Sequence, residues 1–273
     1  SYIDWLIRYK PSFFVLENVT GMLSAKPGGR SIPNLMSRAF KEIGYEIPCI
    51  SKRIVYNLAD FGAPQNRKRV ILFGVRKNKN VNAIKMVECF YNLLDKQMTL
   101  PSDVSSTIKD LPKLLPLEIT KLRSSHTLNS NDPMHFPRFH NQRDISIFKL
   151  LALDILKKDP QFKSTSSKLK LYNEKVGRSA NFQKYNVLSW FNPSNTICAH
   201  LQKDGLRYIH PDPDQARSIT MREAARLQTF PDNFTFTAPN TQIYKMIGNA
   251  VAPMMSRKIG LAVKNTFKNF NKF

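Results

Sequence analysis

Three short stretches of the sequence carry residues that could do chemistry. The first is the apolar run 13–19, which lies between Pro11 and Thr20 and carries the polar pair Glu17–Asn18 near its end. We expect a strand that is buried on both faces, with a carboxylate at its carboxyl end, where ligands of open α/β sheets bind. A buried carboxylate needs a partner or a function. A glutamate that simply reaches water is the alternative, and this strand alone favours it.

The second stretch leads from a Gly-Ala-Pro turn at 62–64 through Gln65, Arg67 and Arg69 into an apolar strand at 69–75. Because side chains alternate along an extended chain, these three polar side chains are expected on one face. Two guanidinium groups aimed at one place suit a phosphate or a base carbonyl. A solvent-exposed, basic strand entry is an equally good interpretation of this stretch alone.

The third stretch is the Gly248–Asn249 pair, which lies between a short expected helix at 239–247 and a final helix from about Pro253. Glycine and asparagine favour a left-handed backbone and would present an exposed amide. The amino terminus of the final helix would offer free N–H groups to an anion such as a carboxylate. Taken alone, the stretch is better interpreted as an ordinary turn between two helices.

The elements expected around these stretches indicate an α/β fold. Residues 1–76 predict, in order, a helix at 1–10, a strand at 13–19, a helix at 31–43, a strand at 47–56, a loop and a strand at 69–75. This alternation is half of a doubly wound sheet. Residues 77–194 are less regular, with helices expected at 81–94 and 144–157, and we interpret them as an inserted lobe. Regular helices return in 195–273, where Thr220 and Glu223 form a capping box.

Charge and composition restrict the partner. The 273 residues include 42 Lys+Arg against 20 Asp+Glu, a net charge of +22, and the hydrophobic share of 42% is enough for a core. Such a charge favours nucleic acid, whose phosphates bind Lys and Arg. An anionic membrane surface fits less well, because no helix concentrates a basic amphipathic pattern. A generally basic proteome would explain only part of the excess.

The cysteines and the hydropathy favour a cytoplasmic protein. Cys49, Cys89 and Cys198 are odd in number and far apart, so they give neither a disulfide framework nor a zinc spacing. A reducing compartment fits this pattern. No apolar run is long enough to span a bilayer. We expect the three cysteines to be packing residues.

Four motifs, taken in order, resemble the later motifs of the DNA cytosine-5 methyltransferases. They are Glu-Asn-Val at 17–19, Gln-Asn-Arg-Lys-Arg at 65–69, Arg-Glu-Ala-Ala-Arg-Leu-Gln-x-Phe-Pro-Asp at 222–232 and Gly-Asn-Ala-Val-x-Pro at 248–253. The resemblance implies a partial Rossmann-like methyltransferase sheet with an inserted, irregular target-recognition lobe. Residues 1–76 would be the C-terminal half of the catalytic domain and 77–194 the target-recognition region. Residues 195–273 would support that lobe and return to the catalytic domain as closing helices.

The resemblance also implies a role for individual residues. The family flips a cytosine out of double-stranded DNA, and S-adenosylmethionine supplies the methyl group that is added to C5. Glu17 matches the glutamate that binds N3 and the N4 amino group, for which it must hold a proton, as a dry pocket favours. Arg69 matches the residue that binds the O2 edge, with Arg67 beside it toward the nucleophile and the backbone.

Two further sets of residues match later parts of the family pattern. The segment that closes over the cofactor corresponds to Asn249, Ala250 and Val251. A stretch that mostly supports the recognition lobe corresponds to Arg217, Thr220, Arg222 and Glu223. We therefore expect the first set near the cofactor and the second set to be structural.

Two family elements are missing, the Gly-rich cofactor turn and the Pro-Cys-Gln segment whose cysteine attacks C6, and both are expected ahead of Ser1. Pro48-Cys49-Ile50 is not a substitute, because it follows Glu17, lacks the glutamine and lies inside an expected strand. We therefore expect part of a restriction-modification methyltransferase that is inactive without a complementary N-terminal segment or subunit. Position 1 is not Met, which favours a fragment over a truncated gene or a natural subunit. The alternative is a non-catalytic DNA-binding subunit or regulator. A general RNA-binding protein fits less well, because the sequence lacks the aromatic motif with which such proteins recognise RNA.

Overall fold

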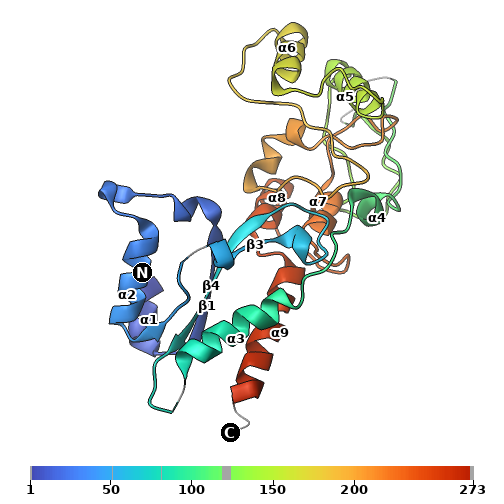
Figure 1. Cartoon of the computed structure of the whole chain (residues 1–273). Coiled ribbons are helices and arrows are strands. Elements are labelled where there is room, and N and C mark those ends of the chain that lie inside the picture. The colour runs from blue at the N-terminus through green and yellow to red at the C-terminus, as the bar shows by residue number, and fades with distance from the viewer. Residues whose placement is uncertain (1, 51, 81, 119–123, 271–273) are drawn as a thin grey trace. The chain divides into compact units, whose positions relative to one another are not determined.

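The computed structural model describes residues 2–50, 52–80, 82–118 and 124–270, and the chain divides into two compact units (Figure 1). The first unit comprises Ser1–Gly62, Asn66–Pro101 and Val251–Phe273. The second comprises Ala63–Gln65 and Ser102–Ala250. In the described part of the chain, no helix is both long and apolar enough to cross a membrane.

A small antiparallel sheet forms the centre of the first unit. Its middle strand is β4 (Lys68–Arg76), which pairs with β1 (Phe13–Val19) on one side and with β2 (Tyr45–Glu46) and β3 (Val55–Asn57) on the other. The apolar run of β4 is almost completely buried. This strand therefore forms the core of the unit and fixes the register of its neighbours.

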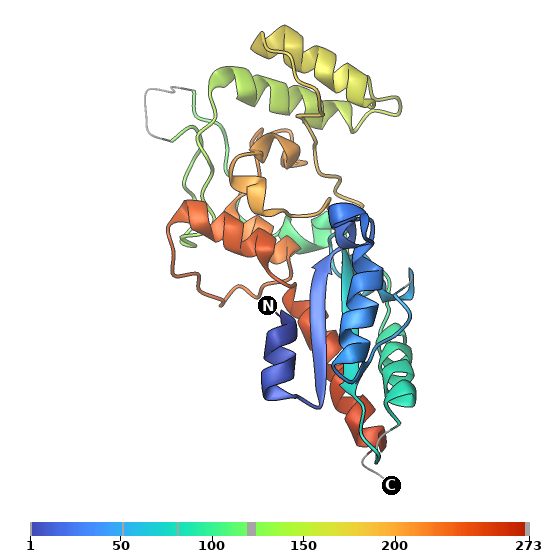
Figure 2. The ribbon, with the colours of Figure 1, turned by 90° about the vertical axis from the view of Figure 1, so that its left-hand side faces the viewer.

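Helices cover both faces of this sheet, α1 (Tyr2–Tyr9) and α2 (Ile32–Glu42) on one and α3 (Ala83–Asp95) and α9 (Pro253–Phe270) on the other (Figure 1). Adjacent residues of β1 show the two layers, because their side chains point to opposite faces. Phe14 stacks on Phe40 of α2 with the ring centroids 4.7 Å apart, whereas Phe13 contacts Phe267 of α9 at 4.9 Å. The helices α3 and α9 lie side by side (Figure 2), and Gln97 Nε2 donates a hydrogen bond to the carbonyl of Lys258.

The α/β class expected from the sequence is confirmed, and the strands at 13–19 and 69–75 form where they were predicted. The expected burial of β1 on both faces is wrong: within β1 only Phe14 is buried, because β1 lies at the edge of the described sheet and β4 occupies its middle. The expected strand at 47–56 is also wrong over most of its length, since pairing stops after Glu46 and resumes at Val55. Pro48 lies in the gap and cannot donate to a strand ladder.

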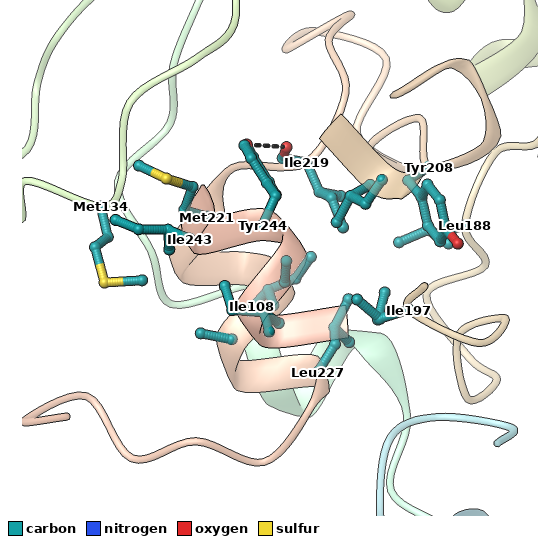
Figure 3. Close-up of a cluster of buried hydrophobic side chains, with 14 of the residues drawn as sticks. Ile108, Met134, Leu188, Ile197, Tyr208, Ile219, Met221, Leu227, Ile243 and Tyr244 are labelled. Atoms are coloured by element: carbon teal, nitrogen blue, oxygen red, sulfur yellow. Dashed lines mark hydrogen bonds between the residues drawn. The ribbon is translucent and has the colours of Figure 1, made fainter. Parts of the chain in front are cut away.

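The second unit is built from short helices and loops. Its helices are α4 (Val104–Ile108), α5 (Gln142–Asp154), α6 (Thr165–Val176), α7 (Met221–Leu227) and α8 (Asn240–Asn249). A core cluster joins α4, α7 and α8, with Ile108, Leu227 and Ile247 among its most buried members (Figure 3). A second cluster joins α5 and α6 around Phe148, Leu171 and Tyr185.

The helices expected at 81–94 and 144–157 are present as α3 and α5, although Val81 lies outside the described residues. α6 was not expected, because its run of Ser and Lys has a weak apolar periodicity. Its end signals are nevertheless visible in the sequence. Ser164 caps the first turn by accepting a hydrogen bond from the backbone N–H of Ser167, and Gly177 follows the last turn in a left-handed conformation.

Candidate active site and its supporting network

Glu17 and Arg69, which the sequence predicts to act together, form an ion pair. Arg69 Nε lies 2.9 Å from Glu17 Oε1, and the two side chains are 14% and 24% exposed. The antiparallel register explains the contact. Val19 lies opposite Arg69, so Glu17, two residues earlier, is the diagonal neighbour of Arg69 on the same face. Burial lowers the pKa of Arg69, and the Glu17 carboxylate partly counteracts that effect.

Arg67 lies just before β4 and is 2% exposed. Its backbone N–H donates to Asn57 Oδ1 at 2.8 Å, and its carbonyl accepts from the N–H of Leu58 at 3.0 Å. These bonds close the loop between β3 and β4 and fix the backbone of Arg67. The loop therefore holds both arginines of the Gln-x-Arg-x-Arg motif in place, one within β4 and one at its entry.

Gln65, the first residue of that motif, has a different environment. It belongs to the second unit, where Nε2 donates to the carbonyl of Leu227 and to Gln228 Oε1, and Oε1 accepts from the N–H of Ile197. The expected common face for Gln65, Arg67 and Arg69 is wrong, because β4 begins only at Lys68 and strand alternation does not extend back to Gln65. Gln65 is a structural residue that joins the end of α7 to the loop at Ile197.

The expected cofactor segment follows α8. Asn249 ends that helix with an exposed side chain, and Ala250 has an extended backbone with φ −65° and ψ 147°. The carbonyl of Ala250 accepts a hydrogen bond from Gln228 Nε2 at 2.9 Å. Val251, the first residue of the next segment of the first unit, is 38% exposed. The segment thus combines exposed side chains with a backbone that is fixed by hydrogen bonding.

The expected left-handed turn at Gly248–Asn249 is not formed. Gly248 is a helical residue of α8, and neither residue has a positive φ. The glycine is needed for a close approach instead: a Cβ there would lie 2.3 Å from the carbonyl carbon of Cys198 and from the N of Ala199. α8 therefore packs directly against the backbone of the turn at Ala199–Gln202.

The expected capping box is confirmed and belongs to a larger buried network. Thr220 Oγ1 accepts from the N–H of Glu223, and Glu223 Oε2 accepts from the N–H of Thr220. Arg217 donates from Nη1 and Nη2 to the two carboxylate oxygens of Glu223 at 2.8 and 2.7 Å. Burial would raise the pKa of Glu223, but Arg217 and then His210 outweigh it and hold that pKa well below its usual range.

Histidines enclose this network, a role that the sequence did not assign to them. His135 bonds Thr220, His210 Nε2 lies 3.5 Å from Glu223 Oε1, and His126 Nε2 lies 2.9 Å from the carbonyl of Gln215. Burial lowers the pKa of His126 to about 4 and that of His210 to about 3. His126 and His210 are therefore neutral near pH 7 beside the buried network. The only sequence signal for His126 and His135 is the density of His and Pro at 126–143, and His210 lies outside that stretch.

The three cysteines are free thiols in different surroundings. Cys198 Sγ lies 3.1 Å from Tyr208 Oη, and Cys89 is half-buried on α3. Cys49 is exposed, so the expectation that it packs is wrong; it lines a cavity of about 260 Å³ whose described lining does not include Glu17 or Arg69. Residues 48–50 are not in a strand, so that reason for rejecting Cys49 as nucleophile is also wrong.

Comparisons with known proteins place the chain in a family. The family model for C-5 cytosine-specific DNA methylase matches residues 1–265. The type II methyltransferase M.Bpa9945I of Bacillus paralicheniformis is 34% identical over 94% of this chain, and M.DdeI of Desulfomicrobium norvegicum is 27% identical over 99%. The chain spans 61% of the length of the first relative and 67% of the second.

The fold is shared with a solved structure. A prophage-encoded protein of E. coli, described as a DNA modification methyltransferase, superposes with a TM-score of 0.62 at 21% identity, covering 98% of this chain and 73% of that one. This likeness in fold covers residues of both units. The chain therefore belongs to the C-5 cytosine-specific DNA methylase family.

Proposed function

We propose that the chain is part of a restriction-modification DNA methyltransferase, which transfers a methyl group from S-adenosylmethionine to C5 of a cytosine flipped out of double-stranded DNA. The observation that carries this proposal is the contact between Glu17 and Arg69 at 2.9 Å, in a chain of this family. The pair offers a carboxyl group and a guanidinium group on one face of two adjacent strands. Together these groups match the N3, N4 and O2 positions of a cytosine edge.

Base binding requires the Glu17–Arg69 pair to separate. An ion pair uses the ionised carboxylate, whereas donation to cytosine N3 requires a protonated carboxyl group. Glu17 therefore gains a proton as the base displaces Arg69, and its other oxygen accepts from the N4 amino group. Arg69 then donates to O2, while Arg67, whose backbone is fixed by Asn57 and Leu58, lies beside it.

The chain also offers residues for the cofactor. Asn249 has an exposed side-chain amide, and Gln228 fixes the backbone of Ala250, so Asn249, Ala250 and Val251 fit a segment that closes over a ligand. S-adenosylmethionine, when bound, supplies an electrophilic methyl group. Asn249 would donate to a polar group of the cofactor, and Ala250 and Val251 would exclude water from one side of it.

The remaining parts of the proposal concern the rest of the enzyme. Residues 77–194 serve as the target-recognition region, 195–273 support it, and the charge of +22 favours DNA in the bacterial cytoplasm as the substrate. The Pro-Cys-Gln nucleophile segment does not occur in these 273 residues. A complementary N-terminal segment or subunit would supply it, and the chain alone would not methylate DNA.

The test is transfer of labelled methyl groups to DNA. The chain is assayed alone and after co-expression with the N-terminal part of the Bacillus relative, with Glu17→Gln and Glu42→Gln as variants. Glu42 is a matched control, because it is a glutamate of the first unit that is ion-paired with Arg38 at 2.8 Å. We expect labelling only in the complemented enzyme, its loss in Glu17→Gln and its retention in Glu42→Gln. A folded complex that labels no DNA would refute the proposal.

A non-catalytic DNA-binding subunit is the second candidate, favoured by the charge of +22 and by the missing nucleophile segment. The same assay separates the two. A complex that binds duplex DNA tightly but transfers no label supports the binding subunit. Labelling of DNA that is lost in Glu17→Gln supports the enzyme.

A further inference from the structure

We propose that the loop at 177–184 inserts into duplex DNA, with Phe182 stacking on a base and Arg178 and Lys184 binding phosphates or base edges. This inference rests on the proposed function, since it assumes that DNA is the substrate. It assigns base contact to one segment of the second unit. Residues 177–184 read Gly-Arg-Ser-Ala-Asn-Phe-Gln-Lys and contain no acidic residue.

Both ends of this loop are fixed by hydrogen bonds. At the start, Gly177 has φ +71° and its N–H donates to the carbonyl of Asn173 at 2.9 Å, which ends α6. At the end, Gln183 Oε1 accepts from Thr165 Oγ1 at 3.0 Å, and Gln183 Nε2 donates to the carbonyl of Tyr185 at 2.9 Å. Tyr185 is 0% exposed and belongs to the core cluster of α5 and α6. The loop therefore projects from a well-packed part of the second unit.

The side chains between these fixed ends are exposed. Phe182 is 53% exposed, and Arg178, Ser179 and Asn181 are exposed as well. Lys184 Nζ lies 3.9 Å from the centroid of the Phe182 ring, so an ammonium group covers part of the aromatic face. An exposed phenylalanine held against a cation is suited to a ligand that combines a flat π-surface with negative charge.

A nucleic acid has both of these properties. Bases stack on aromatic side chains, and each stacked base loses about 1–3 kcal/mol when the aromatic residue is replaced by alanine. Arg178 has the bidentate geometry for guanine O6 and N7, and Asn181 has that for adenine N6 and N7. Lys168, Lys170 and Lys175 add positive charge on α6, against the single acidic residue Glu174.

The surroundings favour DNA over a protein partner for this loop. An apolar protein contact would be served by several neighbouring apolar side chains, whereas the residues next to Phe182 are Asn181 and Gln183. The loop therefore has one aromatic group in a polar and basic setting. That composition is typical of nucleic-acid contact through stacking and phosphate binding.

The test measures binding of the full chain to fluorescein-labelled duplexes of about 24 base pairs with a randomised centre, by anisotropy over a range of salt concentrations. Phe182→Ala is compared with Phe234→Ala, a control that removes a phenylalanine of the same unit that is 43% exposed and lies outside residues 77–194. Phe182→Leu keeps apolar volume without a π-face. Urea unfolding of each variant verifies that the fold is retained.

We expect Phe182→Ala and Phe182→Leu to weaken binding about 5- to 150-fold and Phe234→Ala to leave it unchanged. Arg178→Gln should reduce the slope of log K against log salt by about 0.9 if it contacts a phosphate, or alter the selected sequence if it contacts a base. Equal binding by the wild type, Phe182→Ala and Arg178→Gln would overturn the inference and leave the proposed function standing. A wild-type chain that binds no duplex would also overturn the inference, whereas the proposed function is decided by methyl transfer in the complemented enzyme.

Discussion

Replacing Glu223 with glutamine should destabilise the second unit strongly. Glu223 is 0% exposed and its carboxylate accepts three hydrogen bonds, two from the guanidinium of Arg217 and one from the N–H of Thr220. Arg217 is likewise 0% exposed. The substitution preserves side-chain size, so it removes charge and acceptor capacity with little change in volume.

The expected loss can be derived from these contacts. A glutamine has one acceptor oxygen and a donating NH₂ group, so at least one N–H of Arg217 or Thr220 faces another donor. A buried donor without an acceptor costs about 1–3 kcal/mol, and a buried charge without its partner about 3–5 kcal/mol. We expect a loss of about 3–5 kcal/mol in the free energy of unfolding, a large part of the roughly 5–15 kcal/mol typical of a domain.

Urea unfolding monitored by tryptophan fluorescence measures this loss. Trp190 reports on the second unit, because its ring packs edge-on against His210 at 5.3 Å. The control is Glu42→Gln, which breaks an exposed pair with Arg38 and should leave the free energy of unfolding nearly unchanged. Adding Arg217→Met to Glu223→Gln should restore part of the loss by removing the unpaired charge. Equal effects of Glu223→Gln and Glu42→Gln would refute the reasoning.

Three other predictions concern the site, the packing of α8 and the dependence on pH. In a complemented enzyme, Glu17→Gln should lower turnover at least about 100-fold while lowering the free energy of unfolding by less than Glu223→Gln does, as assayed by methyl transfer and urea unfolding. Gly248→Ala should lower the unfolding midpoint markedly, because its Cβ would lie 2.3 Å from backbone atoms of Cys198 and Ala199; an unchanged midpoint would contradict this packing. Burial lowers the pKa of His140 to about 3, from an ordinary value of 6.5. Below pH 6.5 the unfolded chain binds a proton at His140 that the folded chain does not bind. The contribution of neutral His140 to the free energy of unfolding is therefore complete above pH 6.5 and decreases as the pH falls toward 3. When Tm is followed against pH, this decrease should be smaller in His140→Gln.

Local sequence patterns predict the structure correctly where that structure depends only on residues close together in the chain. The capping box of Thr220 and Glu223 could be predicted in full, since both halves lie within one turn. The strand at 69–75 was equally clear, because its apolar run is interrupted only by Gly74. By contrast, the sequence does not specify that Glu223 also binds Arg217 and lies beside His210, because these contacts depend on how loops pack.

The errors have a common physical origin in tertiary contacts. Gly248 was interpreted as a source of a positive φ, which is the usual reason for a glycine near a helix end. The helix in fact continues through Gly248, and the glycine is required by the backbone of Cys198. Gln65 was grouped with the arginines by strand alternation, yet the strand starts three residues later and Gln65 binds Leu227 and Ile197. Periodicity alone does not give the residue at which a strand begins.

The ion pair of Glu17 and Arg69 indicates how the site is prepared before a base arrives. The side chains of Arg69 and Glu17 are 14% and 24% exposed, so separating them costs more than the roughly 0.2–1 kcal/mol of an exposed pair. The pair is not simply a barrier to base entry, because the cytosine edge offers both groups new hydrogen bonds. Each group instead holds the other on the shared face of β1 and β4, so the base exchanges one partner for another without first having to order two free side chains. Arg69→Met should therefore weaken base binding by more than the loss of its own hydrogen bond, because Glu17 would then also have to be ordered.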